Sequence, residues 1–102
     1  MIMTTTVHTY EDCGPYFDPC VMKYRANNFK DLLRHVRMAM DDCVDSIAVF
    51  RDGVLIGAWD AQGDAEPDGE GGMYPVFCGY ERVKPNTSYW NQILNLFPDA
   101  RN

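Results

Sequence analysis

Apolar residues recur at helical spacing between Asn28 and Val44. A stripe at this period predicts an amphipathic helix over 28–44 that packs one side against a core. Asn28 is a favourable N-cap, and the carboxylate of Asp31 suits the positive end of a helix. Cys43, at the end of the stripe, is then expected to be a small buried side chain. The stripe consists of Phe29, Leu32, Leu33, Val36, Met40 and Cys43.

Two runs of β-forming residues flank Asp52-Gly53 in the segment SIAVFRDGVLIGAW. This dipeptide predicts a tight two-residue hairpin turn, because both turn positions need a positive φ. The turn pairs Arg51 with Val54, Phe50 with Leu55, and Val49 with Ile56. Strand alternation then predicts two apolar faces. One carries Ile47, Val49, Ile56 and Ala58, and the other carries Phe50, Leu55 and Trp59.

Further strands are predicted over 4–11, 21–26 and 73–83, with a bulge at Gly79 in the last of them. A short helix over 88–97, capped by Thr87 or Ser88, is expected to cover the face with Phe50 and Trp59. The segment 61–72 is acidic and rich in glycine, which predicts an exposed, mobile loop. The sequence therefore predicts a single compact α+β domain over 1–102. Its small antiparallel sheet has about five strands, in the order β-β-α-β-β-β-α, with one long and one short helix.

Composition and charge argue against several classes of function. The 102 residues are 46% hydrophobic, which fits one packed domain. The formal net charge of −6 opposes nonspecific binding to nucleic acid and to anionic membranes. The sequence contains neither an apolar run long enough to span a membrane nor a secretory signal, so a cytoplasmic protein is expected.

Four cysteines, Cys13, Cys20, Cys43 and Cys78, raise the question of a metal site. Structural zinc sites use closely spaced pairs, and the chain has no Cys-x-x-Cys, so no metal and no cofactor is expected. His8 would approach Cys20 if the first two strands pair. A disulfide across CGPYFDPC, or a small metal- or thiol-dependent enzyme or sensor using Cys13 and Cys20, remains an alternative.

Catalytic motifs are missing from the sequence. It contains no GxGxxG, P-loop, HExxH or GxSxG motif, so an enzyme is not expected. The stretch DAEPDG resembles the first half of an EF-hand calcium loop. Pro75, however, occupies the position where such a loop needs a bidentate glutamate.

The leading hypothesis is a small acidic protein-binding module. Acidic side chains suit a basic partner, and aromatic side chains supply anchors for binding. Such a partner could be a nucleic-acid-binding protein, and the module an inhibitor or adaptor, similar in size and charge to inhibitors encoded by phages and mobile elements. A homodimer also remains open. The candidate partner-binding residues are Asp60, Asp64, Glu66, Asp68, Glu70, Tyr16, Phe17 and Trp59.

Two questions remain open at this stage. Tyr16 and Phe17, in the middle of CGPYFDPC, either plug the core or form the tip of an interface. The segment from Lys23 to Arg37 is basic and contains Tyr24, which favours a second alternative, a binder of single-stranded nucleic acid. Its cations are Lys23, Arg25, Lys30, Arg34 and Arg37.

Overall fold

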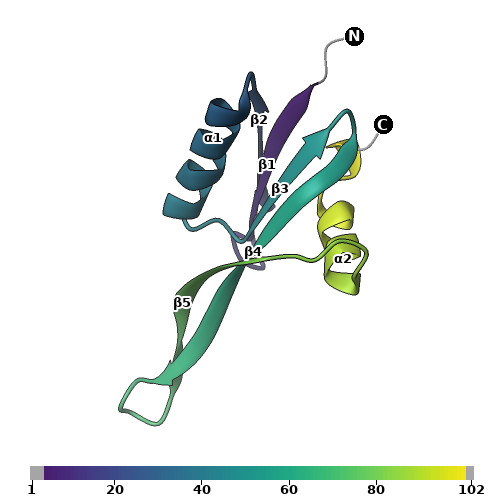
Figure 1. Ribbon diagram of the computed structural model, residues 1–102. Coiled ribbons are helices and arrows are strands. Elements are labelled where there is room, and N and C mark those ends of the chain that lie inside the picture. The colour runs from purple at the N-terminus through teal and green to yellow at the C-terminus, as the bar shows by residue number, and fades with distance from the viewer. Residues whose placement is uncertain (1–3, 101–102) are drawn as a thin grey trace.

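The structure, a computed structural model, describes residues 4–100, except for the side chains of Pro75 and Cys78. It is an α+β fold in which one sheet packs with one longer and one shorter helix (Figure 1). The elements follow the predicted order: β1 (Thr5–Glu11), β2 (Cys20–Ala26), α1 (Phe29–Asp41), β3 (Ser46–Arg51), β4 (Val54–Pro67), β5 (Met73–Arg82) and α2 (Ser88–Leu96), with a final 3-10 turn (Pro98–Ala100). Asn28 and Thr87 cap the two helices, as predicted.

The five strands pair antiparallel in the order β2-β1-β3-β4-β5. The two helices lie on opposite faces of this sheet (Figure 1). Helix α1 packs mainly on β1 and β2, whereas α2 covers the other face above β3 and β4. We refer to these as the α1 side and the α2 side of the sheet.

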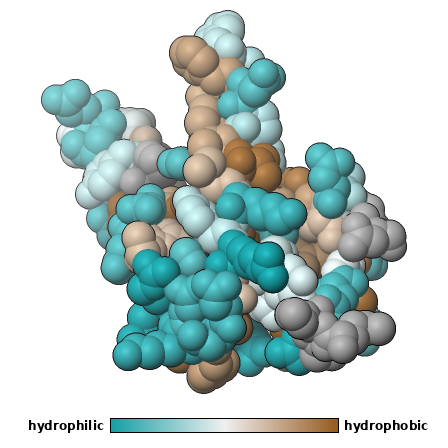
Figure 2. All heavy atoms as spheres, turned by 90° about the horizontal axis from the view of Figure 1, so that it is seen from above, coloured by the Kyte–Doolittle hydropathy of each residue, from teal (hydrophilic) through white to brown (hydrophobic). Residues whose placement is uncertain are grey.

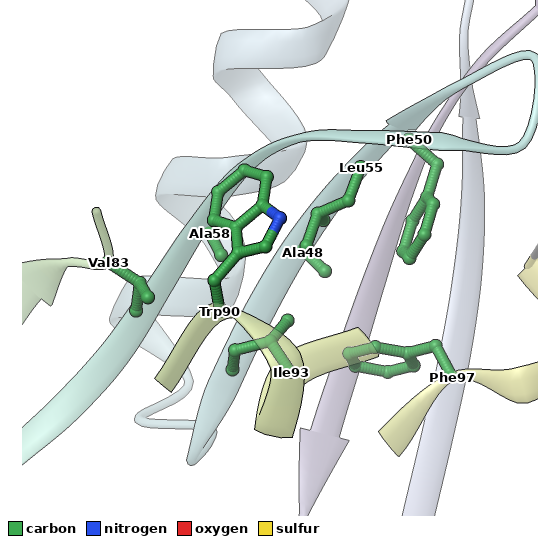
Figure 3. Close-up of a cluster of buried hydrophobic side chains, with 8 residues drawn as sticks. All are labelled: Ala48, Phe50, Leu55, Ala58, Val83, Trp90, Ile93 and Phe97. Carbon is green, nitrogen blue, oxygen red and sulfur yellow. The ribbon is translucent and has the colours of Figure 1, made fainter. Parts of the chain in front are cut away.

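The core on the α2 side joins the short helix to the central strands. Figure 3 shows Trp90, Ile93 and Phe97 pointing from this helix region towards the sheet. Phe97 packs its ring edge-on to Phe50, with ring centroids 6.2 Å apart. Burial of these large apolar side chains is what holds α2 on the sheet. The cluster consists of Ala48, Phe50, Leu55, Ala58, Val83, Trp90, Ile93 and Phe97.

Only part of the predicted apolar stripe of α1 is buried in the core on the α1 side. Val36 and Ala39 are buried against Val7, Ile47 and Val49. The buried face of α1 is rotated around the helix axis relative to the predicted stripe. Helix α1 packs on β1 and β2, so its flank towards β3 is left uncovered. Phe29 and Leu33 lie on that open flank and are exposed.

Cys43 is exposed, so its predicted burial is wrong. It follows the C-cap residue Asp42 and has φ +57°. Its N–H donates to the carbonyl of Met40, and the N–H of Val44 donates to the carbonyl of Ala39. This is the Schellman arrangement, in which the left-handed position is usually glycine. The chain reverses at Cys43, and Val44 takes the buried position instead.

The β3–β4 hairpin starts in the predicted register and then departs from it. Asp52 and Gly53 both have positive φ, and the pairs nearest the turn form as predicted. A β-bulge then places Gly57, not Ile56, opposite Val49. One extra residue moves every later side chain to the other face. Two predicted faces are therefore wrong: Ala58 lies on the α2 side, and Trp59 lies on the α1 side.

The segment 61–72 is not the predicted loop. Strand β4 continues to Pro67 and pairs with β5 up to Met73, so only residues 68–72 form the turn. Pairing shifts by one residue where β5 reaches Gly79, which confirms the predicted bulge. Residues 62–79, which we call the arm, project from the body of the protein (Figure 1). The arm makes the molecule 60 Å long and 27 Å wide.

Candidate functional site

Two hydrogen bonds, from Ala61 and Tyr80, fix the base of the arm to the body. The hydroxyl of Tyr80 donates to the carbonyl of Val44 over 2.5 Å. The backbone of Asp45 accepts from the N–H of Ala61 and donates to the carbonyl of Tyr10. Burial, reinforced by Cys43 and the acidic groups nearby, raises the pKa of Tyr80 to about 12. Tyr80 therefore remains a neutral hydrogen-bond donor at physiological pH, and the arm leaves the body at a defined position.

Strand pairing divides the side chains of the arm and its base between two faces. Residues that pair across the two strands share a face, and successive residues alternate. Tyr80 belongs to the core on the α1 side, and its ring lies 5.4 Å from that of Phe77. The face that continues the α1 side is therefore mainly apolar, with Trp59, Ala61, Ala65, Met73, Phe77 and Tyr80, and its one charged side chain is Arg82, opposite Trp59 at the base. The face that continues the α2 side is acidic, with Asp60, Asp64, Glu66 and Glu81.

On the acidic face, several carboxylates already have partners. The hydroxyl of Ser46 donates to Oδ1 of Asp60 over 2.7 Å. The hydroxyl of Tyr74 donates to Oε2 of Glu66 over 3.0 Å. Asp60 also lies directly opposite Glu81 in the paired strands. Like charges in such a pair are destabilising, so the stability of the hairpin does not account for this pair.

Asp68 closes the turn at the end of the arm. Its Oδ1 accepts from the N–H groups of Glu70 and Gly72, over 2.8 and 3.0 Å. These two backbone hydrogen bonds lower the pKa of Asp68. The carboxylate therefore has a structural role in the turn, whereas Glu70 is an exposed charge beside it.

Trp59 is not on the acidic face. It is partly buried against the core on the α1 side, and its ring lies over Gly57. The guanidinium of Arg82 stands 5.8 Å from the centre of this ring. The structure thus separates Trp59 from the carboxylates with which the sequence hypothesis grouped it.

Tyr16 and Phe17 are exposed, at 90% and 72% of their surface, so their reading as core plugs is wrong. They lie in the β1–β2 connection, which emerges from the same end of the sheet as the arm (Figure 1). The N–H of Asp12 in this connection donates to Oδ2 of Asp45 over 2.6 Å. The connection is thereby tied to the same segment that holds the base of the arm.

Acidic side chains gather at this end of the molecule. Elements that the sequence separates meet here: the end of β1, the end of α1, the start of β3, and the arm. The acidic residues of β1 and of the β1–β2 connection were not among those predicted for the site, because only the strand pairing brings them to this end. The group comprises Glu11, Asp12, Asp18, Asp41, Asp42, Asp45, Asp60, Asp64, Glu66, Asp68, Glu70 and Glu81.

The basic segment over 23–37 does not form one patch. Lys23 lies opposite His8 on the α2 side of β2, and Arg25 shares that face. Lys30, Arg34 and Arg37 instead follow the outer surface of α1, where helical spacing places them together. Figure 2 views the molecule from the end opposite the arm, and its surface there is largely hydrophilic. Tyr24 is not an open stacking platform, because its ring stacks on His35 at 5.1 Å.

Cys13, Cys20, Cys43 and the two histidines, whose side chains the structure describes, do not converge on one site. Cys13 and Cys20 are exposed free thiols. His8 points to the α2 side between Phe50 and Phe97, whereas Cys20 shares the other face with Glu11, so the expected approach of His8 to Cys20 is wrong. Burial, with Lys23 nearby, lowers the pKa of His8. Within 4–100, and leaving aside Cys78, no three His, Cys, Asp or Glu side chains are placed to hold a metal ion.

A groove of about 540 Å³ runs between the base of the arm and the start of α2. Two carboxylates, Asp60 and Glu81, and two cations, Arg82 and Lys84, line it together with Tyr89. An extended side chain is of suitable size to enter this groove. No helix among the described residues is long and apolar enough to cross a membrane.

Comparison with protein-family models, with curated proteins and with solved structures finds no match for this chain.

Proposed function

We propose that this chain is a protein-binding module whose acidic arm engages a basic surface of a partner protein. One observation carries the proposal: a long two-stranded hairpin leaves the body and presents Asp60, Asp64, Glu66 and Glu81 on one face. An isolated two-stranded hairpin is at best marginally stable in water. A structure of this kind is well explained if its exposed face contacts another molecule.

The like-charged pair Asp60 and Glu81 supports the same proposal. Their mutual repulsion would be relieved by an arginine or lysine of the partner entering the groove beside them. The arm and the neighbouring carboxylates also create a negative field that would accelerate the encounter with a basic partner. Tyr16 and Phe17 emerge at the same end and would supply apolar contacts.

The partner class that fits best is a nucleic-acid-binding protein with a basic cleft. Carboxylates on a narrow ribbon would then occupy the place of phosphates, and the module would act as an inhibitor or adaptor. No catalytic role and no cofactor is part of this proposal. The exposed free thiols Cys13, Cys20 and Cys43 support a reducing, cytoplasmic setting.

The test compares two charge-matched variants. The arm variant carries Asp64→Asn and Glu66→Gln, and it keeps Asp68 because that side chain closes the turn. The control variant carries Asp52→Asn and Asp99→Asn, which removes the same charge from exposed positions outside the acidic group and keeps the side-chain oxygen of residue 52 that accepts from Thr4. Each protein is used as tagged bait, and bound proteins are quantified by mass spectrometry.

We expect a stoichiometric basic partner with the wild type and the control, and its loss with the arm variant. Affinity for the purified partner should fall steeply with added salt. A partner retained equally by all three baits would contradict the proposal for the arm and direct attention to Tyr16 and Phe17. Stoichiometric metal in the purified protein would instead favour the alternative that uses Cys13 and Cys20.

A further inference from the structure

The apolar face of the arm continues the α1 side of the sheet, and α1 does not reach it. Phe77 is 48% exposed, and Met73 at the end of the arm is exposed as well. Nearer the body the same face carries Trp59 and Tyr80, which are only partly buried. This face is separate from the carboxylates of the proposed partner site, which point to the α2 side. Apolar side chains gathered on one exposed surface mark a contact surface.

Helix α1 forms one wall beside the part of the sheet from which this face continues. Met38 and His35 mark its flank towards β2, since they line a groove with Met22 and Tyr24. The opposite flank of the helix, with Phe29 and Leu33, therefore faces the open part of the sheet. Lys30 and Arg37 border that flank at helical spacing. The molecule thus has a step with an apolar floor and a wall edged by Lys30 and Arg37, with Asp41 at the end of the helix nearest the arm.

We propose that this step binds the arm of a second copy of the chain, in a two-fold symmetric dimer. A two-fold axis places a surface against itself, so this mainly apolar face, whose one cation Arg82 lies over Trp59, can form both halves of the contact. Chains with a net charge of −6 would repel each other through their acidic faces. The α1 side of the arm is the surface on which two arms can meet without bringing Asp64 and Glu66 together.

Size and charge favour an antiparallel arrangement. From Gln62 to Gly69 the arm extends about 23 Å at the usual rise of a strand, and α1 is about 20 Å long. The arm of a second copy, packed on the sheet, would add a layer about 10 Å thick, and a helix is also about 10 Å thick. Such an arm would therefore fill the step beside α1. Arms that cross near Ala61 then bring Asp68 and Glu70 of one copy towards Lys30 and Arg37 of the other. The acidic end meets cations, and the acidic faces remain outside.

Sedimentation equilibrium of the full chain tests this dimer without any other protein, so its outcome is independent of the proposed partner. We expect twice the chain mass of 11.7 kDa for the wild type. Phe77→Glu should reduce the mass to that of one chain. Tyr74→Glu is the matched control, because Tyr74 is 45% exposed on the opposite face of the same hairpin and should leave the dimer intact. A wild type that stays monomeric, or a Phe77→Glu variant that dimerises as well as the control, overturns the proposal.

A second pair of variants covers the case in which Phe77→Glu does not fold, as judged by circular dichroism. Lys30→Glu with Arg37→Glu changes exposed positions on α1 and should raise the dimer dissociation constant about tenfold or more, since each change occurs twice in the dimer. Lys23→Glu with Arg25→Glu makes the same charge change on the other side of β2 and should have less effect. Equal effects of the two pairs would reject the antiparallel arrangement.

Discussion

Strands β4 and β5 run through both the body and the arm, yet their side chains have different surroundings in the two regions. In the body, Leu55 and Ala58 of β4 are buried beneath α2, and Trp59 packs on the α1 side. Beyond Ala61, the residues of β4 are exposed to its end at Pro67. Backbone pairing continues without this burial. Pairing thus suffices to shape a strand here, whereas stability comes from the apolar surface that the helices cover.

The largest expected effect on stability compares the same substitution, phenylalanine to alanine, in the body and in the arm. Phe50→Ala removes a side chain that is 1% exposed in the body and should lower the free energy of unfolding by about 3–5 kcal/mol. Phe77→Ala removes the same side chain from the arm and should cost about 1 kcal/mol or less, because half of that ring is already in water. Urea unfolding of both variants measures the difference. Equal losses would show that the arm is as much a part of the cooperative core as β3.

The sequence predicted the body better than the arm, and the reason is physical. Helix stripes, caps and the Asp-Gly turn are local signals, and they placed α1, α2 and the β3–β4 hairpin. The arm has glycines and carboxylates where most strands have β-branched residues, so its composition indicates a loop. Its strand character depends on pairing between Asp64 and Val76 and their neighbours, which composition does not reveal.

Two smaller errors came from single residues whose effect depends on the whole fold. The bulge at Ile56 reversed the faces of Ala58 and Trp59, because side-chain alternation has a period of two. The reversal removed Trp59 from the candidate acidic site and placed it beside Tyr80. The left-handed turn at Cys43 ended α1 before the stripe did. The carboxylates over 61–72 are exposed, as predicted for that segment, but only the strand register shows which of them share a face and which lie in the turn.

The next largest effect on stability is expected at the junction of body and arm. Tyr80→Phe removes the hydrogen bond to the carbonyl of Val44 and should destabilise the protein by about 1–2 kcal/mol. The pKa of Tyr80 is about 12 in the folded chain and ordinarily 10.0. An unfolded chain would therefore ionise first, so the wild type should lose stability as pH rises from 10 towards 12, and the phenylalanine variant should lose less. Unfolding measured across this pH range, with tyrosinate absorbance as a monitor, checks both parts.

A smaller effect, of opposite sign, is expected in the body. Cys43→Gly replaces a residue held at φ +57° by the one that adopts this conformation without steric cost. We expect the variant to be more stable by about 1 kcal/mol, measured by urea unfolding. Cys43→Ala is the control: it also removes the thiol but keeps a side chain at the left-handed position, so it should show no such gain. If both variants changed stability alike, the thiol rather than the backbone would be responsible.

The smallest global effect should come from the end of the arm. Asp68→Ala removes the acceptor of the N–H groups of Glu70 and Gly72, so the amide hydrogens of both residues should exchange faster with solvent. Amides of β3 should keep their protection, and the midpoint of urea unfolding should stay within the error of the wild type, because no buried apolar contact is lost. Asp68→Asn retains a side-chain oxygen and should preserve part of the local protection. Loss of protection in β3 together with the arm would mean that the two regions unfold as one unit, and the contrast drawn between body and arm would then fail.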